Sequence, residues 1–193
     1  MADMTAAPPR DFRAAFEQLR AFIANDIRPF MEQEHGHETF GNYTAVLIVV
    51  VGAEALSRLL SQPTLYIFSE FLMRPYGIDR YMAEDVADAL RPGLAHVFET
   101  KGIRAGKLEF ELAVGWGKYR HMTVVREPGA PDCLYLDVRT MWADLQRAFA
   151  SIGDRLDKEP QAFSIPKDYD VPEHSRTESI PGWKKLFTSN KRD

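Results

Sequence analysis

The chain has 193 residues, of which 45% are hydrophobic and 27% are charged, and its formal net charge at pH 7 is −4. This length and composition are typical of one globular domain with its own core, and they favour neither a disordered chain nor a membrane protein. A slightly acidic chain lacks the broad basic surface of strongly basic nucleic-acid-binding proteins, so any contact with RNA has to be local.

Cysteine usage and hydropathy predict a cytoplasmic protein. The single cysteine, Cys133, excludes an internal disulfide, and residues 1–12 lack the basic and apolar regions of a signal peptide. The longest uncharged stretch, residues 39–53, is too short to cross a bilayer. We therefore expect no membrane segment and a location in the reducing cytoplasm.

Hydrophobic periodicity predicts two long helices in the first third of the chain. Residues 1–10 have no periodic pattern and are predicted to form a loose arm. From Asp11 to near Pro29, apolar residues recur every three or four positions, which indicates a helix with one apolar face. Residues 42–60 are apolar on all sides, as in a central helix, although their β-branched run also allows a buried strand.

Two further helices are predicted before the middle of the chain. A short helix over about residues 65–72 is stopped by Pro75 and Gly77. The next helix has Asp79 as its N-cap and reaches Arg91, with its apolar positions on one face and its acidic positions on the other.

After these helices the period of the apolar residues changes from that of a helix to that of a strand. Residues 108–116 alternate in character, which predicts a half-buried strand, and a tight turn at Gly117-Lys118 leads into a second strand over 119–127. Residues 133–138 form a third strand after a loop rich in turn residues. We predict a small three-stranded antiparallel sheet over about 108–138, inserted before the last helix.

The last predicted helix follows the sheet directly. Asp137 or Thr140 can cap it, and its apolar face extends to Leu156. Beyond Lys158, four prolines forbid regular structure. The predicted organisation is therefore an arm over 1–10, a helical domain over 11–157 and an irregular tail over 158–193. The tail has three candidate anchors, which the same chain or a dimer partner would bind: Trp183, Leu186 and Phe187.

One segment resembles a known catalytic motif. The fourth predicted helix ends in Ala89-Leu90-Arg91-Pro92-Gly93-Leu94-Ala95-His96, in which four residues separate Arg91 from His96. This spacing resembles the R-x4-6-H signature of HEPN domains. The wider string and the sheet after it resemble uncharacterised bacterial HEPN-like proteins across roughly residues 11–157. The resemblance implies a bundle of four to five helices, a homodimer whose subunits usually line one cleft, and cleavage of RNA without a metal.

The resemblance also assigns roles to the two residues. The ribose 2′-hydroxyl would attack the adjacent phosphate, with His96 as acid or base and Arg91 holding the charge of the developing phosphorane. An imidazole titrates near neutrality and a guanidinium stays charged, so both suit these roles. A spacing of five residues on a straight helix turns through roughly 140° and rises about 7.5 Å. A composite site across a dimer, or a kinked helix, brings such groups together better than one straight helix.

Pro92 departs from the pattern of the resembled family. Active members usually carry Asn, Asp or His directly after the Arg, whereas a proline there disfavours helical geometry at Arg91 and predicts a kink. The alternative function is therefore a non-catalytic, HEPN-like dimerising module that binds a protein or nucleotide partner. His96 would then pack at a helix end, and Arg91 would form a salt bridge. Arg28 and His35, with six residues between them, also match R-x4-6-H, so context rather than spacing distinguishes the motif.

An acidic residue in the most apolar helix is a candidate supporting group. Burying the carboxylate of Glu54 is costly unless it meets a cation or a donor. Arg58, one turn later, is the simplest partner. Arg91 or His96 would be a functional one, and a contact with His96 would orient the imidazole.

Two further sets of residues suggest ligands. Lys101, Arg104 and Lys107 follow the motif and are candidates for contacts with the RNA backbone, although a solvated surface explains them equally. His35 and His37, with Glu38, allow a metal site, but a catalytic centre needs at least three converging ligands. We expect no metal or other cofactor in the proposed RNA cleavage.

Overall fold

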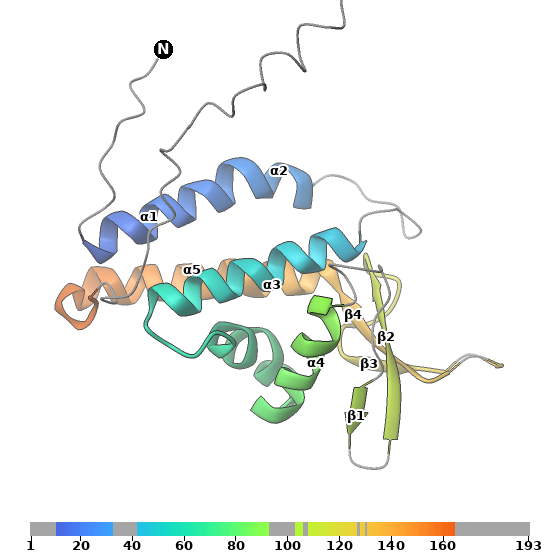
Figure 1. The fold of residues 1–193 in the computed structure, drawn as a ribbon. Coiled ribbons are helices and arrows are strands. Elements are labelled where there is room, and N and C mark those ends of the chain that lie inside the picture. Colours follow the sequence, from blue (N-terminus) through green and yellow to red (C-terminus); the bar gives the residue numbers. More distant parts are fainter. Residues whose placement is uncertain are drawn as a thin grey trace, which may run out of the picture.

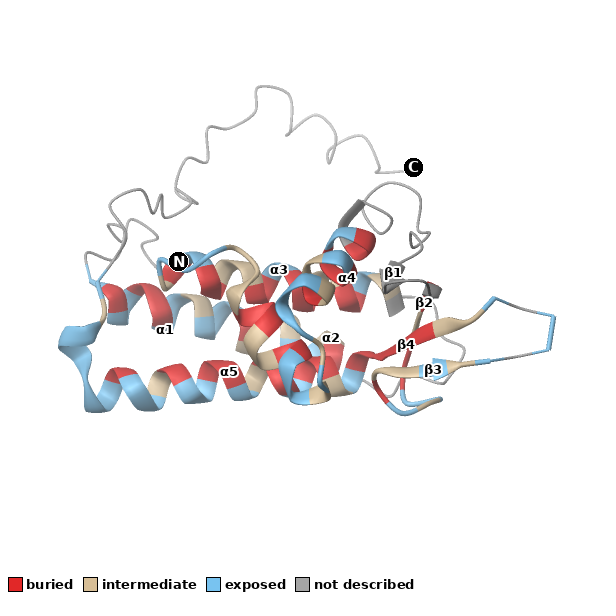
Figure 2. Cartoon of the chain, turned by 90° about the horizontal axis from the view of Figure 1, so that it is seen from below, coloured by how far each residue is buried: buried red, intermediate tan, exposed pale blue. Residues whose placement is uncertain are grey.

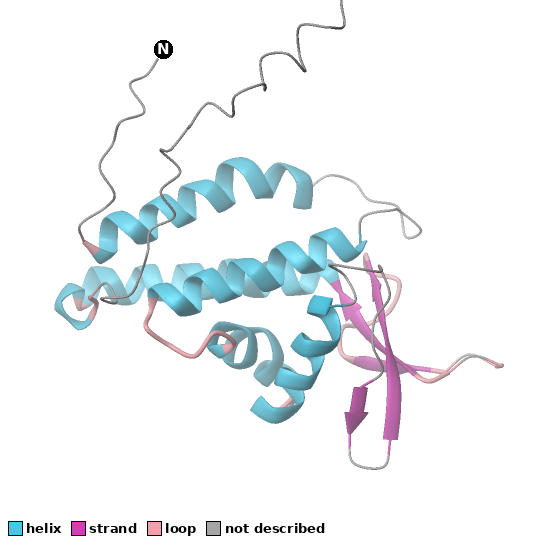
Figure 3. Ribbon diagram, viewed as in Figure 1, coloured by secondary structure: helices cyan, strands magenta, loops and turns pink. Residues whose placement is uncertain are grey.

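The computed structural model describes residues 11–32, 42–92, 103–105, 108–126, 128–129 and 131–164. Within these ranges the chain is mainly helical, with a small sheet at one end of the helical bundle (Figure 1). Figure 3 shows the strands grouped together on one side of the helices. No helix in these ranges combines the length and the apolar composition needed to cross a membrane.

The first helical segment is longer than predicted. It consists of α1 (Phe12–Phe22), a π-helical turn η1 (Ile23–Ile27) and α2 (Arg28–Met31) without a break. The predicted end near Pro29 is thus slightly early. The N–H of Arg28 bonds five residues back, to the carbonyl of Ile23, so the missing donor of Pro29 falls where the hydrogen-bonding pattern already changes.

The second helix, α3 (Asn42–Leu59), is confirmed, and the alternative of a buried strand is wrong. Its inner face is fully buried against the other helices. Ser57 joins this face to the next segment, because its hydroxyl oxygen accepts a hydrogen bond from the N–H of Ile67 at 2.9 Å. The prediction that other elements cover the helix on all sides is wrong, because Val51 on its outer face is 55% exposed.

The third and fourth helices follow at the predicted places. The short third helix contains a π-helical segment η2 (Phe68–Met73) and a 3₁₀ turn η3 (Arg74–Tyr76), and it stops at Gly77 with a φ of +80°. The fourth, α4 (Arg80–Pro92), begins after Asp79, whose carboxylate accepts a hydrogen bond from the N–H of Met82 at 2.9 Å. The predicted N-cap is therefore confirmed.

The sheet differs from the prediction in its pairing. Four strands lie in the order β1-β2-β4-β3. Their bounds are β1 (Ile103–Ala105), β2 (Leu108–Gly115), β3 (Thr123–Val125) and β4 (Cys133–Asp137). β2 pairs with β1 antiparallel but with β4 parallel, and β3 pairs antiparallel with β4. The sheet is thus mixed, and the predicted three-stranded antiparallel sheet with a hairpin between β2 and β3 is wrong.

Hydrogen bonds from the segment after β2 explain this topology. The N–H of Gly117 bonds to the carboxylate of Asp137 at 2.6 Å, and the N–H of Lys118 bonds to the hydroxyl of Tyr135 at 3.1 Å. The N–H of Met122 then bonds to the backbone carbonyl of Tyr135 at 2.8 Å. These bonds lead the chain past the end of β4, so β3 forms on its far side and is shorter than the predicted strand over 119–127.

The last helix, α5 (Val138–Lys158), packs against α3. Asp137 caps it, because its carboxylate accepts hydrogen bonds from the N–H and the hydroxyl of Thr140, which confirms one of the two predicted caps. The buried residues of α1, α3 and α5 face one another (Figure 2). A 3₁₀ turn follows at η5 (Pro160–Ala162), and the ring of Phe163 packs on Phe12 with centroids 4.9 Å apart. The folded unit therefore extends past the predicted boundary at 157.

Candidate functional site

The helix that carries the candidate arginine keeps its regular geometry to its end. Both Arg91 and Pro92 belong to α4, so Arg91 is helical although a proline follows it. A proline in the last turn removes one backbone donor from a helix. The apolar face of α4 compensates for this loss, because four of its side chains have no exposed surface: Ala83, Val86, Ala87 and Leu90.

Of the pair Arg91 and His96, only Arg91 lies within the described part of the chain. Arg91 comes two turns after Glu84 on α4, so the two positions lie on the same side of the helix. His96, Lys101 and Lys107 lie outside the described residues, and Arg104 is described only as the middle residue of β1. The structure therefore fixes the backbone position of Arg91 and leaves the pairing of Arg91 with His96 as a prediction.

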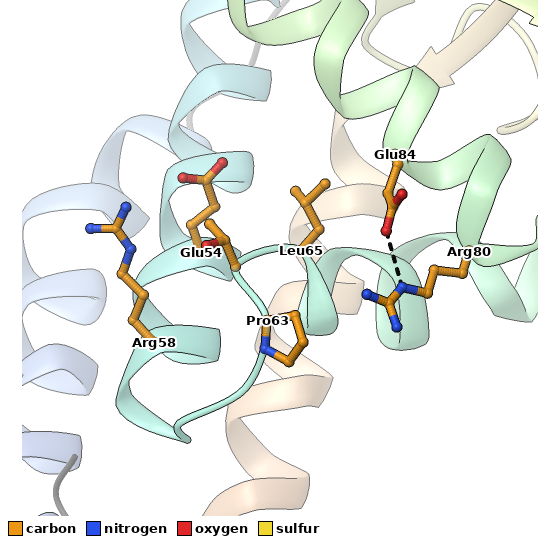
Figure 4. A pocket seen from close by; sticks show the side chains of 7 residues that line it. Glu54, Arg58, Pro63, Leu65, Arg80 and Glu84 are labelled. Atoms are coloured by element: carbon orange, nitrogen blue, oxygen red, sulfur yellow. Dashed lines mark hydrogen bonds and ion pairs between the residues drawn. The ribbon is translucent and has the colours of Figure 1, made fainter.

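An open pocket of about 500 Å³ lies beside the first half of α4. The end of α3, the loop after it and the start of α4 form its walls (Figure 4). Its lining residues are Glu54, Arg58, Pro63, Thr64, Leu65, Arg80 and Glu84. Two cations and two carboxylates line it, and Nε of Arg80 lies 3.0 Å from Oε1 of Glu84.

The predicted supporting residues, Glu54 and Arg58, both belong to this pocket. They lie one turn apart on the wall that α3 provides (Figure 4). The premise that Glu54 is buried is wrong, because its side chain is partly exposed at the pocket and Arg58 is exposed. The desolvation cost that required a close partner for Glu54 is correspondingly smaller. Its pairing with Arg58 stays a prediction.

A second polar cluster, which the sequence prediction missed, connects the sheet to the helices. The imidazole Nδ1 of His121 accepts a hydrogen bond from the N–H of Asp137 at 3.0 Å. The ring of Tyr76 packs edge-on against this imidazole with centroids 4.6 Å apart. The hydroxyl of Tyr76 donates to the carboxylate of Asp144 at 2.8 Å, and Arg147 pairs with the same carboxylate.

Burial shifts the pKa values in this cluster. Desolvation lowers the pKa of His121 to about 4, although the carboxylate of Asp137 acts in the opposite direction. Burial also raises the pKa of Asp144, against the stabilising effects of Tyr76 and Arg147. The pKa of Tyr76 is raised by its own burial and by its hydrogen bond to Asp144. At neutral pH the imidazole is therefore uncharged.

The geometry of this cluster indicates a structural role. His121 is only 6% exposed, and Tyr76 covers one side of its ring, so a substrate has no direct approach to the imidazole. Because Nδ1 accepts a hydrogen bond, the proton of the neutral ring sits on Nε2, which has no hydrogen-bond partner in the described part of the chain. The cluster ties η3, the sheet and α5 together.

Neither a search for metal ligands nor comparison with known proteins indicates another functional site. Across the described ranges, no group of three or more His, Cys, Asp or Glu side chains could hold a metal ion. His35, His37 and Glu38 lie outside those ranges. No family model, no curated protein and no solved structure matches the chain.

Proposed function

We propose that the chain is a HEPN-type helical domain that binds RNA and cleaves it without a metal, with Arg91 and His96 as the active pair. The main support is that α4 includes Arg91 in spite of Pro92, because a proline at this position disfavours helical geometry at the residue before it. The position of Arg91, at the end of an amphipathic helix and before a small sheet, also agrees with the proposal.

The proposed mechanism is an in-line transesterification. The 2′-hydroxyl of the ribose attacks the adjacent phosphorus, and the bond to the 5′-oxygen of the next nucleotide breaks. His96 takes the proton of the 2′-hydroxyl or gives one to the leaving oxygen, and Arg91 holds the charge of the phosphorane. The products are a 2′,3′-cyclic phosphate and a free 5′-hydroxyl. A homodimer would supply both residues to one cleft, with Lys101, Arg104 and Lys107 as contacts for the RNA backbone.

The test is cleavage of a mixed, structured RNA in excess EDTA by the wild type and three variants. We expect the wild type to produce fragments that end in a cyclic phosphate. His96→Ala and Arg91→Ala should each reduce the cleavage rate by at least about a hundredfold, as expected for loss of an acid–base group or of a charge-stabilising group. The matched control is His35→Ala, because Arg28 and His35 have a similar spacing. Undiminished cleavage by His96→Ala would remove the proposal.

A second candidate is the non-catalytic module that binds a partner. The chain has a net charge of −4. This charge opposes binding of a polyanion and favours a partner with basic groups. If the wild type neither cleaves nor retains RNA in a filter-binding assay at low salt, this candidate becomes the better one.

A further inference from the structure

Two large apolar side chains are exposed beside the contact between α1 and α3. Phe22 on α1 and Val51 on α3 are 52% and 55% exposed, whereas most large apolar side chains in the described ranges are buried. The two helices approach closely at the next residues, because a Cβ atom placed on Gly52 would lie 3.6 Å from Cδ1 of Ile23.

The two exposed side chains lie on the same side of this contact. α1 and α3 run in opposite directions (Figure 1). In an antiparallel pair, the residues just before the two contacting positions are rotated by about 100° toward the same flank. Phe22 and Val51 are these residues. The partly exposed Ile48 and Ala55 lie one turn on either side of Val51. We call Phe22, Ile48, Val51 and Ala55 the α1–α3 apolar surface.

The size of this surface fits a short segment better than a second subunit. Half-exposed Phe and Val side chains leave on the order of 200 Å² of apolar area. A stable interface between two proteins buries about 800 Å² on each partner. A tethered segment needs far less, because a flexible linker gives it an effective concentration in the mM range.

Residues 180–187 of the same chain have a suitable sequence. They read Ile-Pro-Gly-Trp-Lys-Lys-Leu-Phe, so Trp183, Leu186 and Phe187 all follow Pro181 and recur at the i, i+3 and i+4 spacing with which helical peptides bind apolar grooves. The basic residues Lys184 and Lys185 lie between the apolar ones. This segment lies outside the described residues.

The chain leaves the described fold at a place from which this segment reaches the surface. Phe163 packs on Phe12, at the first turn of α1, and Phe22 lies ten residues further along that segment, about 15 Å away. Trp183 lies 20 positions after Phe163, and random-coil dimensions for 20 residues give a root-mean-square distance of about 25 Å. The linker thus spans the distance without strain and keeps the effective concentration near its maximum.

The charges are complementary as well. Residues 180–193 contain four basic residues and one acidic residue, a net charge of +3, whereas the whole chain has −4, so residues 1–179 carry −7. Acidic residues also follow each exposed apolar side chain by one turn. Asp26 follows Phe22 on the first helical segment, and Glu54 follows Val51 on α3.

We propose that residues 180–187 dock within the same chain on the α1–α3 apolar surface, with Trp183 and Phe187 against Phe22 and Val51 and with Lys184 and Lys185 toward the flanking carboxylates. At an effective concentration of about 1 mM, even a segment with an isolated dissociation constant of about 1 mM is docked half of the time. This proposal is independent of any activity of Arg91 and His96.

Paramagnetic relaxation measured by NMR on the full chain tests this directly. A spin label is attached at Ser189→Cys in a Cys133→Ser background, two residues after Phe187. We expect broadening of the amide signals around Phe22 and Val51. Val51→Glu should lower the ratio of docked to free segment about tenfold, because it places a charge against Trp183. The matched control is Val124→Glu, since Val124 is an exposed valine of the sheet.

The outcomes are distinct. Broadening that Val51→Glu removes and Val124→Glu keeps supports the proposal. Equal broadening in both variants, or none around Phe22 and Val51 in the parent protein, overturns it. A mixture of spin-labelled unenriched protein and unlabelled ¹⁵N-enriched protein separates the two possible sources. Broadening at the same signals in this mixture means that a second copy supplies the segment, which also overturns docking within one chain.

Discussion

Substitution of His121 should remove a specific acid sensitivity from the protein. The folded chain holds this imidazole in its neutral form, with Nδ1 accepting a hydrogen bond from the N–H of Asp137 at 3.0 Å. Burial lowers its pKa to about 4, while an exposed histidine in the unfolded chain titrates near 6.5. The unfolded state therefore binds a proton at a higher pH than the folded state. The stability that His121 contributes is complete above about pH 6.5 and is lost as the pH falls toward 4.

The size of the effect follows from the two pKa values. Between pH 7.5 and pH 5.0, the linkage relation gives a loss of about 2 kcal/mol from His121 alone, and the full shift corresponds to about 3 kcal/mol. This is a large part of the stability of a typical domain, which is about 5–15 kcal/mol. The raised pKa of Asp144 acts in the opposite direction, because the folded state then binds a proton more readily as the pH falls. The comparison of a variant with the wild type cancels this contribution.

The assay is urea-induced unfolding followed by circular dichroism at pH 7.5 and pH 5.0. The variant is His121→Asn, because the amide oxygen of asparagine can accept the same hydrogen bond but does not titrate. We expect the wild type to lose about 2 kcal/mol more than the variant between the two pH values. His174→Asn controls for the removal of a histidine as such. Equal losses in the wild type and His121→Asn would show that the folded chain does not hold His121 in its neutral form.

Two further predictions concern buried hydrogen bonds. Asp137→Ala removes the acceptor for the N–H groups of Gly117 and Thr140, and should lower the free energy of unfolding by about 2–4 kcal/mol in urea denaturation. If Asp137→Ala and Asp137→Asn lose the same free energy of unfolding within error, this prediction is wrong. Ser57→Ala leaves the buried N–H of Ile67 without its acceptor and should cost about 1–3 kcal/mol, whereas Ser57→Thr, which keeps the hydroxyl, should cost less.

The helices were largely predictable because their signals are local. The apolar period that begins at Asp11, and the caps at Asp79 and Asp137, each depend on residues within one or two turns. The π-helical segments η1 and η2 were not predicted. A π turn adds one residue to a turn to suit the packing around it, so the sequence of the turn itself carries little signal.

The strands were found by their alternation, but their order was not. The turn residues Gly117-Lys118 suggested a hairpin between neighbouring strands. In the structure their N–H groups bond to the side chains of Asp137 and Tyr135, which lie 17 or more residues later. Alternation reports which face of a strand is buried and not which strand lies beside it, so partners this distant cannot be read from the pattern.

The polar cluster around Asp144 shows how far the sequence alone leads to a site. Position 144 lies three residues after Met141 and four before Ala148, both fully buried, so an acid there interrupts the apolar face of α5. A buried carboxylate needs a partner, and the buried one is Asp144, whereas Glu54 is partly exposed. The burial of Asp144 predicts that a donor exists. It does not name Tyr76, 68 residues earlier, because only the packing of η3 against α5 brings that hydroxyl within 2.8 Å.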